Sequence, residues 1–391
     1  MKILLVRLRL LGDVVFTTPL LRALRRQFPD ASLTYVVEPL AAGVVLGNPH
    51  LHDVIVAPHA KGLSRLRADV ALGWQLRRRR FDVAIDMHGG PRSAWLARAS
   101  GAPVRVGYAI KGRRWMYTTV VDRAPDLGPR HSVENQWDLL LPLGLDACNP
   151  VRDAVEMPDD AAAEARVGSR LHQAGVSPSH PVVLIHVSAG NAFRRWPASA
   201  FADLVVGLVE RDEQRRVVVT AGPSEPATER LICEAARARL GPRRGAVLDL
   251  GDLDLAELRA LTQRASVYIG GDSGPLHVAA TTHTPIVALL GPTLSERSGP
   301  WRDPRWFSEM IEDSLPCRPC HQRTCEPGDF RCLTGIAPNR VLDAAERAIA
   351  IGTRGLTVSR SDRVAPGRRP ASRPLPPRWL RPCRSSIGWR R

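Results

Sequence analysis

Nine short apolar runs, arranged along the chain in two series, constrain the fold of this sequence more than any other feature. The first series has runs at residues 2–8, 32–37, 53–57 and 82–86, and the second has runs at 182–186, 216–222, 246–251, 266–271 and 285–291. Helical patterns lie between runs, as where Leu20, Leu21 and Leu24 share one face. This alternation predicts parallel sheets covered by helices on both faces.

A loop-rich junction near residues 150–180 separates the two series, and 391 residues suffice for two domains. We therefore predict an α/β chain of two Rossmann-like, doubly wound domains that face each other across a cleft. The predicted domains are residues 1–165 and 166–352, followed by a disordered tail at 353–391. Ligands of open α/β sheets bind beyond the carboxyl ends of strands, so the loops after the runs are candidate sites.

The loop after the run at 266–271 carries a group of small and polar residues at the start of an expected helix. The group consists of Asp272, Ser273, Gly274 and His277. Glycines allow close approach of a ligand, and a helix N-terminus attracts anions, so this segment fits a nucleotide diphosphate. The same residues fit a second interpretation, in which Asp272 or Ser273 caps the helix and His277 packs in the interior.

Two more loops of the second series fit the same ligand. Ser188 and Arg194 follow the run at 182–186, where small residues admit a phosphate and arginine supplies forked donors. Glu225 follows the run at 216–222 and offers a carboxylate to ribose hydroxyls. The alternatives are a solvated pair of arginines and a carboxylate at a helix start.

In the first series, Gly12 and Asp13 follow the first run, and His88 and Arg92 follow the fourth. Asp13 fits a general base or a helix N-cap, and the spacing does not choose between them. His88 and Arg92 are available to a polar or anionic acceptor. No HExxH, GxSxG, Walker A or GxGxxG pattern lies at a suitable place, which removes most support for the corresponding hydrolases and dehydrogenases.

Most of the net charge of +16 lies at one end of the chain. Residues 353–391 contain eleven arginines and one aspartate, so the remainder carries only a moderate positive excess. We expect no nucleic-acid partner and a passive tail, with binding of the tail to RNA or anionic lipid as the alternative. No apolar stretch is long enough to span a membrane, and the N-terminus fits a first strand better than a signal peptide, so we expect a cytoplasmic location.

Four cysteines, Cys317, Cys320, Cys325 and Cys332, follow the pattern C-x2-C-x4-C-x6-C. Such density in a cytosolic chain indicates a metal or redox site more often than a disulfide framework. The spacing differs from that of a zinc ribbon, so two interpretations stay open. One is a structural metal or Fe–S site, and the other is free thiols or a conditional disulfide. We expect the cluster to belong to the scaffold and not to the catalytic site.

Several segments together resemble the ADP-heptose:lipopolysaccharide heptosyltransferases of glycosyltransferase family 9. They are KILLVRLRLLGDVVFTTPLLRALRRQFP, VAIDMHGGPRSAWLARASGAPVRVGY, FRRWP and GDSGPLHVAATTHTPIVALLGPT. The resemblance covers about residues 1–350 and leaves out the basic tail. The first and last of these segments are specific as a pair.

The resemblance implies a GT-B fold and an inverting, metal-independent transfer from ADP-L-glycero-D-manno-heptose to the lipopolysaccharide core, a lipid A/Kdo-type acceptor. In the family's pattern Asp13 is the general base, Arg194 replaces a phosphate-binding lysine, and Glu225 approximates the ribose-binding acid. Asp272, Ser273, Gly274 and His277 match its donor-binding loop. We add Ser188 to the donor side and Gly12, His88 and Arg92 to the acceptor side. No cofactor is expected beyond a structural metal or Fe–S group at the cysteines.

Three departures from the family's pattern affect these expectations. Arg9, Leu10 and Leu11 stand where many members carry serines, which affects the acceptor contacts. Arginine at 194 keeps the charge but changes the reach. The alignment of Glu225 is loose by one residue. The expected partners are a nucleotide sugar and an anionic glycolipid, with peripheral contact at the inner face of the inner membrane.

Two other classes of function compete with this expectation. The nearest alternative is a glycosyltransferase that uses another nucleotide sugar or another glycan acceptor. The more distant one is a non-catalytic nucleotide-, RNA- or metal-binding protein that uses the tail or the cysteines.

Overall fold

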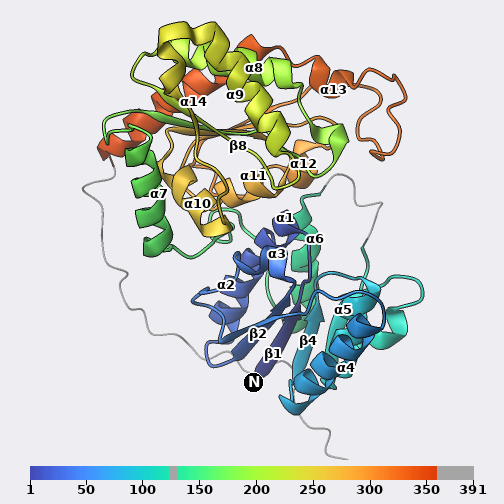
Figure 1. Ribbon diagram of the computed structural model, residues 1–391. Helices are drawn as coiled ribbons and strands as arrows, with labels where there is room; N and C mark the ends of the chain where they lie inside the picture. Colours follow the sequence, from blue (N-terminus) through green and yellow to red (C-terminus); the bar gives the residue numbers. More distant parts are fainter. Residues whose placement is uncertain (124–129, 359–391) are drawn as a thin grey trace, which may run out of the picture.

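The computed structural model describes residues 1–123 and 130–358, which form two α/β halves stacked end to end (Figure 1). Each half contains a six-stranded sheet in which every strand pair is parallel. The strand orders are β3-β2-β1-β4-β5-β6 and β12-β11-β10-β7-β8-β9. The prediction of two doubly wound Rossmann-like halves is confirmed.

The first half contains the following elements. Its strands are β1 (Lys2–Val6), β2 (Ser32–Val37), β3 (Asp53–Val56), β4 (Val83–Asp86), β5 (Val104–Tyr108) and β6 (Thr119–Val121). Its helices are α1 (Leu11–Val15), α2 (Thr18–Gln27), α3 (Pro39–Ala42), α4 (Gly62–Arg78), α5 (Pro91–Ala99) and α6 (Ser132–Trp137), with 3-10 turns η1 (Arg114–Met116) and η2 (Asp138–Leu143).

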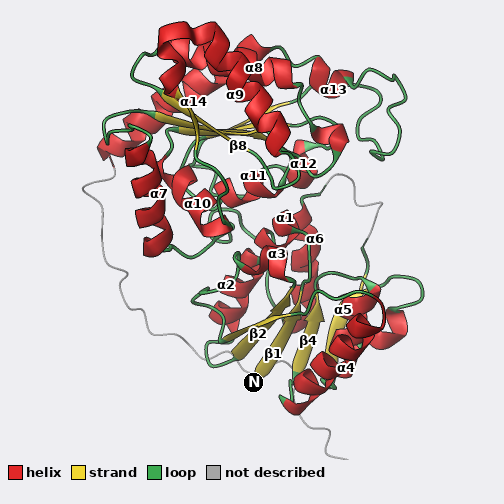
Figure 2. Cartoon of the chain, in the orientation of Figure 1, coloured by secondary structure: helices red, strands yellow, loops and turns green. Residues whose placement is uncertain are grey.

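The second half repeats this plan (Figure 2). Its strands are β7 (Val182–His186), β8 (Arg216–Thr220), β9 (Val247–Asp249), β10 (Val267–Gly271), β11 (Ile286–Leu289) and β12 (Ser308–Ile311). Its helices are α7 (Ala161–Gln173), α8 (Ala198–Arg211), α9 (Pro226–Leu240), α10 (Leu255–Arg264), α11 (Gly274–Ala279), α12 (Ser295–Ser298), α13 (Arg331–Thr334) and α14 (Pro338–Val358), with turns η3 (Ala192–Arg194) and η4 (Gly241–Ala246).

All nine predicted runs contain a strand, whereas β5, β6 and β12 were not predicted. The predicted strands at the centres of the sheets are buried on both faces and are therefore continuously apolar. The three missed strands are only partly buried at several positions, and their sequences contain arginine, threonine or glutamate. Their apolar signal is therefore too weak to separate them from loops.

The central strands divide their side chains between two apolar layers, as the period of two in a strand requires. On β1, Leu4 and Val6 belong to a cluster with α4 and α5, whereas Ile3 and Leu5 face the opposite layer. In the second half, α8, α9 and α14 cover the face of the sheet that lies away from the first half.

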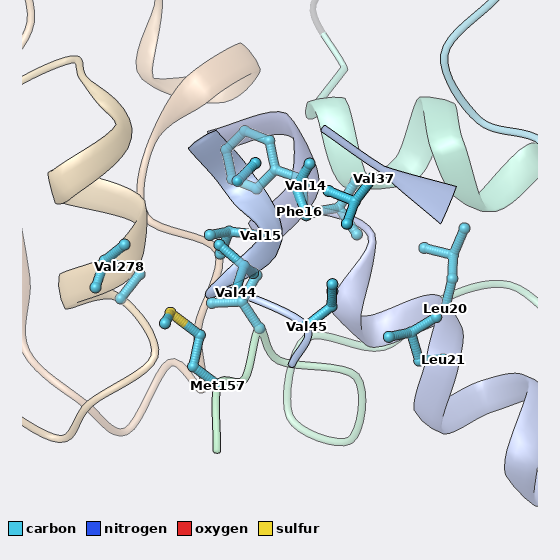
Figure 3. Packing of buried hydrophobic residues seen from close by; sticks show 14 of the residues in the cluster. Val14, Val15, Phe16, Leu20, Leu21, Val37, Val44, Val45, Met157 and Val278 are labelled. Atoms are coloured by element: carbon cyan, nitrogen blue, oxygen red, sulfur yellow. The ribbon is translucent and has the colours of Figure 1, made fainter. Parts of the chain in front are cut away.

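One apolar cluster continues from the first half into the second. Val15 of α1, Met157 of the connecting segment and Val278 of α11 belong to the same buried group, and Figure 3 shows them next to one another. All three side chains are at most 6% exposed. Burial of apolar surface between α1 and α11 therefore stabilises the contact between the halves.

The predicted domain limits meet the structure at two places. The expected boundary at 165/166 falls inside α7. The limits of the two domains stay a prediction. Helix α14 continues to Val358, so disorder is the wrong prediction for residues 353–358. Extending a formed helix needs no new nucleus, which allows it to pass the end of the apolar pattern. The rest of the predicted tail, 359–391, lies outside the described residues.

None of the helices in the described part of the chain combines the length and the apolar character needed to cross a bilayer.

Candidate functional site

The site forms where α1, which follows β1, meets α11, which follows β10. Both strands end at the contact between the halves, as expected for the carboxyl ends of parallel strands. A Cβ on Gly12 would lie 2.3 Å from the His277 ring, and a Cβ on Gly274 would lie 2.5 Å from the Leu11 side chain. Glycine at both positions therefore permits this close approach. The structure brings Gly12 and Asp13 together with the predicted donor loop.

The Asp13 carboxylate lies on α1, beyond the carboxyl end of β1, and remains 35% exposed. Its Oδ2 pairs with Nη2 of Arg7 at 2.5 Å and accepts from the backbone N–H of Leu10 at 3.3 Å. Arg7 also donates to the Met87 carbonyl at the end of β4. The other carboxylate oxygen, Oδ1, has no partner among the described residues and is free to accept a proton.

Asp272 is a buried hub, with its side chain only 3% exposed. It accepts hydrogen bonds from Thr293 Oγ1 at 2.6 Å and from Ser298 Oγ at 3.3 Å. It also pairs with Nη1 of Arg194 at 3.1 Å, and Nε2 of His277 lies 3.7 Å away. Burial alone acts to raise the pKa of Asp272, but His277, Arg194 and Thr293 together hold it below its ordinary value. The hub therefore stays ionised and fixes Arg194.

The guanidinium of Arg194 is held by two partners, and part of it remains available to a ligand. Its Nε donates to Oε1 of Gln322 at 2.6 Å, and its Nη1 points at Asp272. Gln322 also accepts from Asn191 at 3.2 Å. Nη1 also donates to the Asp272 carbonyl at 3.5 Å, so of the five N–H groups of the guanidinium the two on Nη2 stay available, and the side chain is 30% exposed. The arrangement suits an oriented arginine that binds phosphate oxygens.

The start of α11 offers backbone donors next to this arginine. The amide groups of Ser273 and Gly274 donate no hydrogen bond within the described part of the chain, as expected for the first N–H groups of a helix. His277 is buried and packs against Phe16 of the first half, with 4.3 Å between ring centroids and the rings tilted by 54°. His277 therefore lies in the interior, as the second interpretation expected, and also contacts Asp272, while its role in binding the donor stays a prediction.

Glu225 and Ser188 lie on adjacent loops of the second sheet. Ser188 Oγ accepts from the Gly222 amide at 2.8 Å, which ties the loop after β7 to the loop after β8. Glu225 pairs with Arg195, not Arg194, at 2.6 Å. Its other oxygen, Oε2, is buried and has no partner in the described residues. A buried carboxylate oxygen without a donor fits a hydroxyl-bearing ligand such as a ribose.

Arg92 and His88 occupy different surroundings at the end of β4. The guanidinium of Arg92 is 9% exposed and pairs with Glu38 and Asp69, both at 2.7 Å. It also donates to the Pro58 carbonyl, so its donors serve the scaffold of the first half and not an open surface. His88 instead reaches the Arg9 carbonyl with Nδ1 at 3.1 Å, beside the turn that carries Asp13. Burial and then Arg7 lower the pKa of His88.

Thr293, Arg7 and Gln322 are among the residues of the site that were not predicted from the sequence. Thr293 follows the carboxyl end of β11, where a ligand site is expected. The residues around it do not form a pattern that indicates phosphate binding or a catalytic acid. Arg7 lies inside the first apolar run. Gln322 lies among the cysteines, in a segment interpreted as scaffold, and only the three-dimensional contact reveals its link to Arg194.

The cysteine segment lies against the loop that carries Arg194. Cys317, Cys320, Cys325 and Cys332 line one cavity of about 690 Å³ together with Phe193. Burial raises the pKa of the Cys332 thiol, and the other three cysteines act in the same direction. Across the described residues no three His, Cys, Asp or Glu side chains are placed to hold a metal ion, so the metal interpretation stays a prediction.

Comparison with known proteins agrees with this arrangement. The family "Glycosyltransferase family 9 (heptosyltransferase)" matches residues 70–329. Lipopolysaccharide heptosyltransferase 3 of Escherichia coli is 27% identical over 303 residues, which cover 75% of this chain and 84% of that protein.

Two solved structures share the fold. A family 9 glycosyltransferase of Veillonella parvula has a TM-score of 0.78 at 23% identity, and 90% of this chain and 97% of that chain are covered. The Escherichia coli heptosyltransferase WaaC with ADP-2-deoxy-2-fluoro heptose has a TM-score of 0.62 at 19% identity, with 89% and 99% covered. The two parallel sheets are therefore those of a GT-B-like fold.

Proposed function

Because this chain belongs to glycosyltransferase family 9, the heptosyltransferase family, we propose that it transfers a heptose from ADP-L-glycero-D-manno-heptose to a lipopolysaccharide core acceptor. One observation carries the proposal. Helix α1, which carries Asp13, packs against the start of α11, where Asp272, Ser273 and Gly274 lie, so a base and an anion-binding segment share one site. The names of the similar proteins support the heptose and the lipopolysaccharide.

The donor occupies the second half in this proposal. The free amides of Ser273 and Gly274 and the remaining N–H groups of Arg194 bind the diphosphate, and Glu225 accepts from a ribose hydroxyl. Asp272 does not contact the sugar in this proposal, since Arg194, Thr293 and Ser298 all contact its Oδ2 and its Oδ1 lies 3.7 Å from Nε2 of His277. It acts by holding the arginine in place.

The transfer itself uses Asp13. An acceptor hydroxyl attacks the anomeric carbon from the side opposite the diphosphate, and its proton passes to Oδ1 of Asp13. The new C–O bond forms as the bond to the β-phosphate oxygen breaks, ADP leaves with both bonding electrons, and the anomeric configuration inverts. A positioned base contributes about 10²–10⁴-fold to such a step. Arg194 and the amides stabilise the charge that develops on ADP, which makes the transfer metal-independent.

The acceptor lies on the side of the first half. His88, whose Nδ1 lies 3.1 Å from the Arg9 carbonyl, offers a polar group to the acceptor on that side, and Gly12 allows α11 to approach α1 next to Asp13. Arg92 contributes indirectly, because its hydrogen bond to the Pro58 carbonyl holds the loop before α4.

A transfer assay tests the proposal. ADP-heptose is incubated with lipid A/Kdo acceptor and the full chain in the presence of EDTA, and the product is identified by mass spectrometry. We expect addition of one heptose, release of ADP and no loss of rate on chelation. Equal transfer from UDP-glucose or GDP-mannose would contradict the heptose, and loss of transfer in EDTA would contradict the metal-independent step.

A further inference from the structure

Helix α4 carries an apolar stripe that faces solvent. The stripe consists of Leu63, Leu66, Val70 and Trp74, which are 76%, 61%, 42% and 62% exposed. They are spaced three, four and four residues apart, so they lie on one face of the helix. The buried side of the same helix, Leu72 and Leu76, packs on the first sheet's cluster instead. The stripe therefore adds nothing to the fold of the described residues.

The polar residues of α4 are mostly basic. The helix contains four arginines and one aspartate. At helical spacing Arg67 and Arg78 flank the stripe, and neither side chain has a hydrogen bond or ion pair within the described residues, whereas Arg65 pairs with Asp69. Leucine and tryptophan on one face with arginine beside them is the composition of helices that lie in the interface of an anionic membrane.

The position of α4 relates this stripe to the site. The loop before α4 follows the carboxyl end of β3, so it leaves the first sheet at the edge where Asp13 and His88 lie. Figure 1 shows α4 on the outer side of the first half, away from the second half. Arg92 of α5 donates to Pro58 in this loop and holds it in place.

We propose that the exposed stripe of α4 docks on a bilayer that contains anionic phospholipid. The apolar side chains enter the headgroup region, and Arg67 and Arg78 contact the phosphates. The acceptor side of the site then faces the surface in which a glycolipid acceptor is anchored. Only this orientation rests on the proposed function, because the binding of the bilayer does not need the transfer. Residues 359–391 are a poor occupant of the stripe, since they carry ten arginines and one aspartate and would be repelled by the basic helix.

Sedimentation of the full chain with sucrose-loaded vesicles tests this docking. We expect binding to vesicles that contain phosphatidylglycerol, much weaker binding to phosphatidylcholine alone, and a decrease with added salt. Leu66→Asp should weaken binding at least about tenfold. The matched control is Leu231→Asp on α9, whose leucine is 59% exposed in the other half and should not matter. Equal binding of Leu66→Asp and Leu231→Asp would overturn the proposal and assign binding to another basic segment.

Quenching of tryptophan fluorescence by brominated lipid gives a second readout, which electrostatic attraction to the vesicle surface alone does not produce. Trp74 should enter the bilayer, so Trp74→Phe should lose a quenched component of the fluorescence. Unchanged quenching in this variant would also overturn the proposal.

Activity separates the two hypotheses. Leu66→Asp should keep its rate on a water-soluble acceptor fragment and lose rate, about tenfold, on acceptor embedded in vesicles. Binding to vesicles without any transfer would refute the proposed function alone. Transfer at equal rates on both acceptors by the variant would refute the docking alone.

Discussion

Asp13 and Asp272 occupy corresponding places in the two halves, yet the structure fits them for different tasks. Each follows the carboxyl end of a central strand and pairs with an arginine, Arg7 in one case and Arg194 in the other. Asp13 is 35% exposed and its Oδ1 has no partner among the described residues, whereas Asp272 is 3% exposed, with three donors at Oδ2 and Nε2 of His277 3.7 Å from Oδ1. A carboxylate that accepts a proton needs an oxygen that is not already hydrogen-bonded. A carboxylate that positions an arginine is itself fixed by further hydrogen bonds. This difference supports the proposed roles, in which Asp13 accepts the proton and Asp272 positions Arg194.

The largest effect is expected from Asp13→Asn. The amide retains the size of the side chain but accepts no proton, so kcat should fall about 10²–10⁴-fold, or roughly 3–5 kcal/mol in the barrier. Thermal stability should change little, because Asp13 is partly exposed and its ion pair is solvent-screened. Steady-state kinetics and a melting curve measure both quantities. Turnover near that of the wild type would remove Asp13 from the chemistry.

Asp272→Asn should act mainly on the fold and on the donor site. It removes the charge opposite Arg194 in a buried hub, and we expect a loss of about 2 kcal/mol in unfolding free energy together with weaker donor binding. Calorimetry and urea unfolding at neutral pH check this. A stable variant with normal donor affinity but no turnover would reverse the roles of the two aspartates.

The pH dependence of stability sharpens the same test. The pKa of Asp272 is lower in the fold than its ordinary value of 3.8, so its contribution to stability is present above that value. It is lost as the pH falls through the lowered pKa. The gap in melting temperature between the wild type and Asp272→Asn should therefore narrow in acid. A gap that stays constant as pH falls well below 3.8 would contradict this ionised hub.

Gly12→Ala should separate the halves at α1 and α11. A Cβ at this position would lie 2.3 Å from the His277 ring, so the contact must shift, at a cost of about 1–3 kcal/mol. The control is Gly168→Ala on α7, where no atom lies within 4 Å and the helix should gain about 0.5–1 kcal/mol. If both variants unfold at the same denaturant concentration, the close approach of Gly12 and His277 is not a constraint.

Gln322→Ala should give the smallest effect. It removes one acceptor from Nε of Arg194, so donor affinity should fall by about fivefold, near 1 kcal/mol, with kcat nearly unchanged. Gln322→Glu should restore the hydrogen bond, and recovery of affinity in that variant would separate positioning from a general change in the loop. Equal donor affinity in all three proteins would leave Arg194 positioned by Asp272 alone.

The sequence allows most strands of the two sheets, and the loops that follow them, to be predicted, for a common reason. Buried parallel strands are apolar over their whole length, so their positions, and therefore the loops that follow them, can be read from a single chain. Asp13, Asp272 and Glu225 lie in those loops. What the sequence does not contain is the pairing between loops. Spacing gives no reason to link Gln322 to Arg194, because the two residues are distant along the chain. It also gives no reason for Glu225 to pair with Arg195 and not with the neighbouring Arg194.

Arg92 is a further case in which the sequence does not reveal the partners of a side chain. Its place after β4 suggests a contact with the acceptor, but Glu38 and Asp69 come from two other elements and use its donors. The sequence shows an arginine at a strand end and does not show which carboxylates fold against it.

The most direct test of the division between the two aspartates is the calorimetric affinity for ADP-heptose in the wild type, Asp13→Asn and Arg194→Ala. The roles derived above predict that Asp13→Asn binds the donor as tightly as the wild type, whereas Arg194→Ala binds at least about tenfold more weakly. Weaker donor binding in Asp13→Asn with unchanged binding in Arg194→Ala would contradict them and move the donor to the first half.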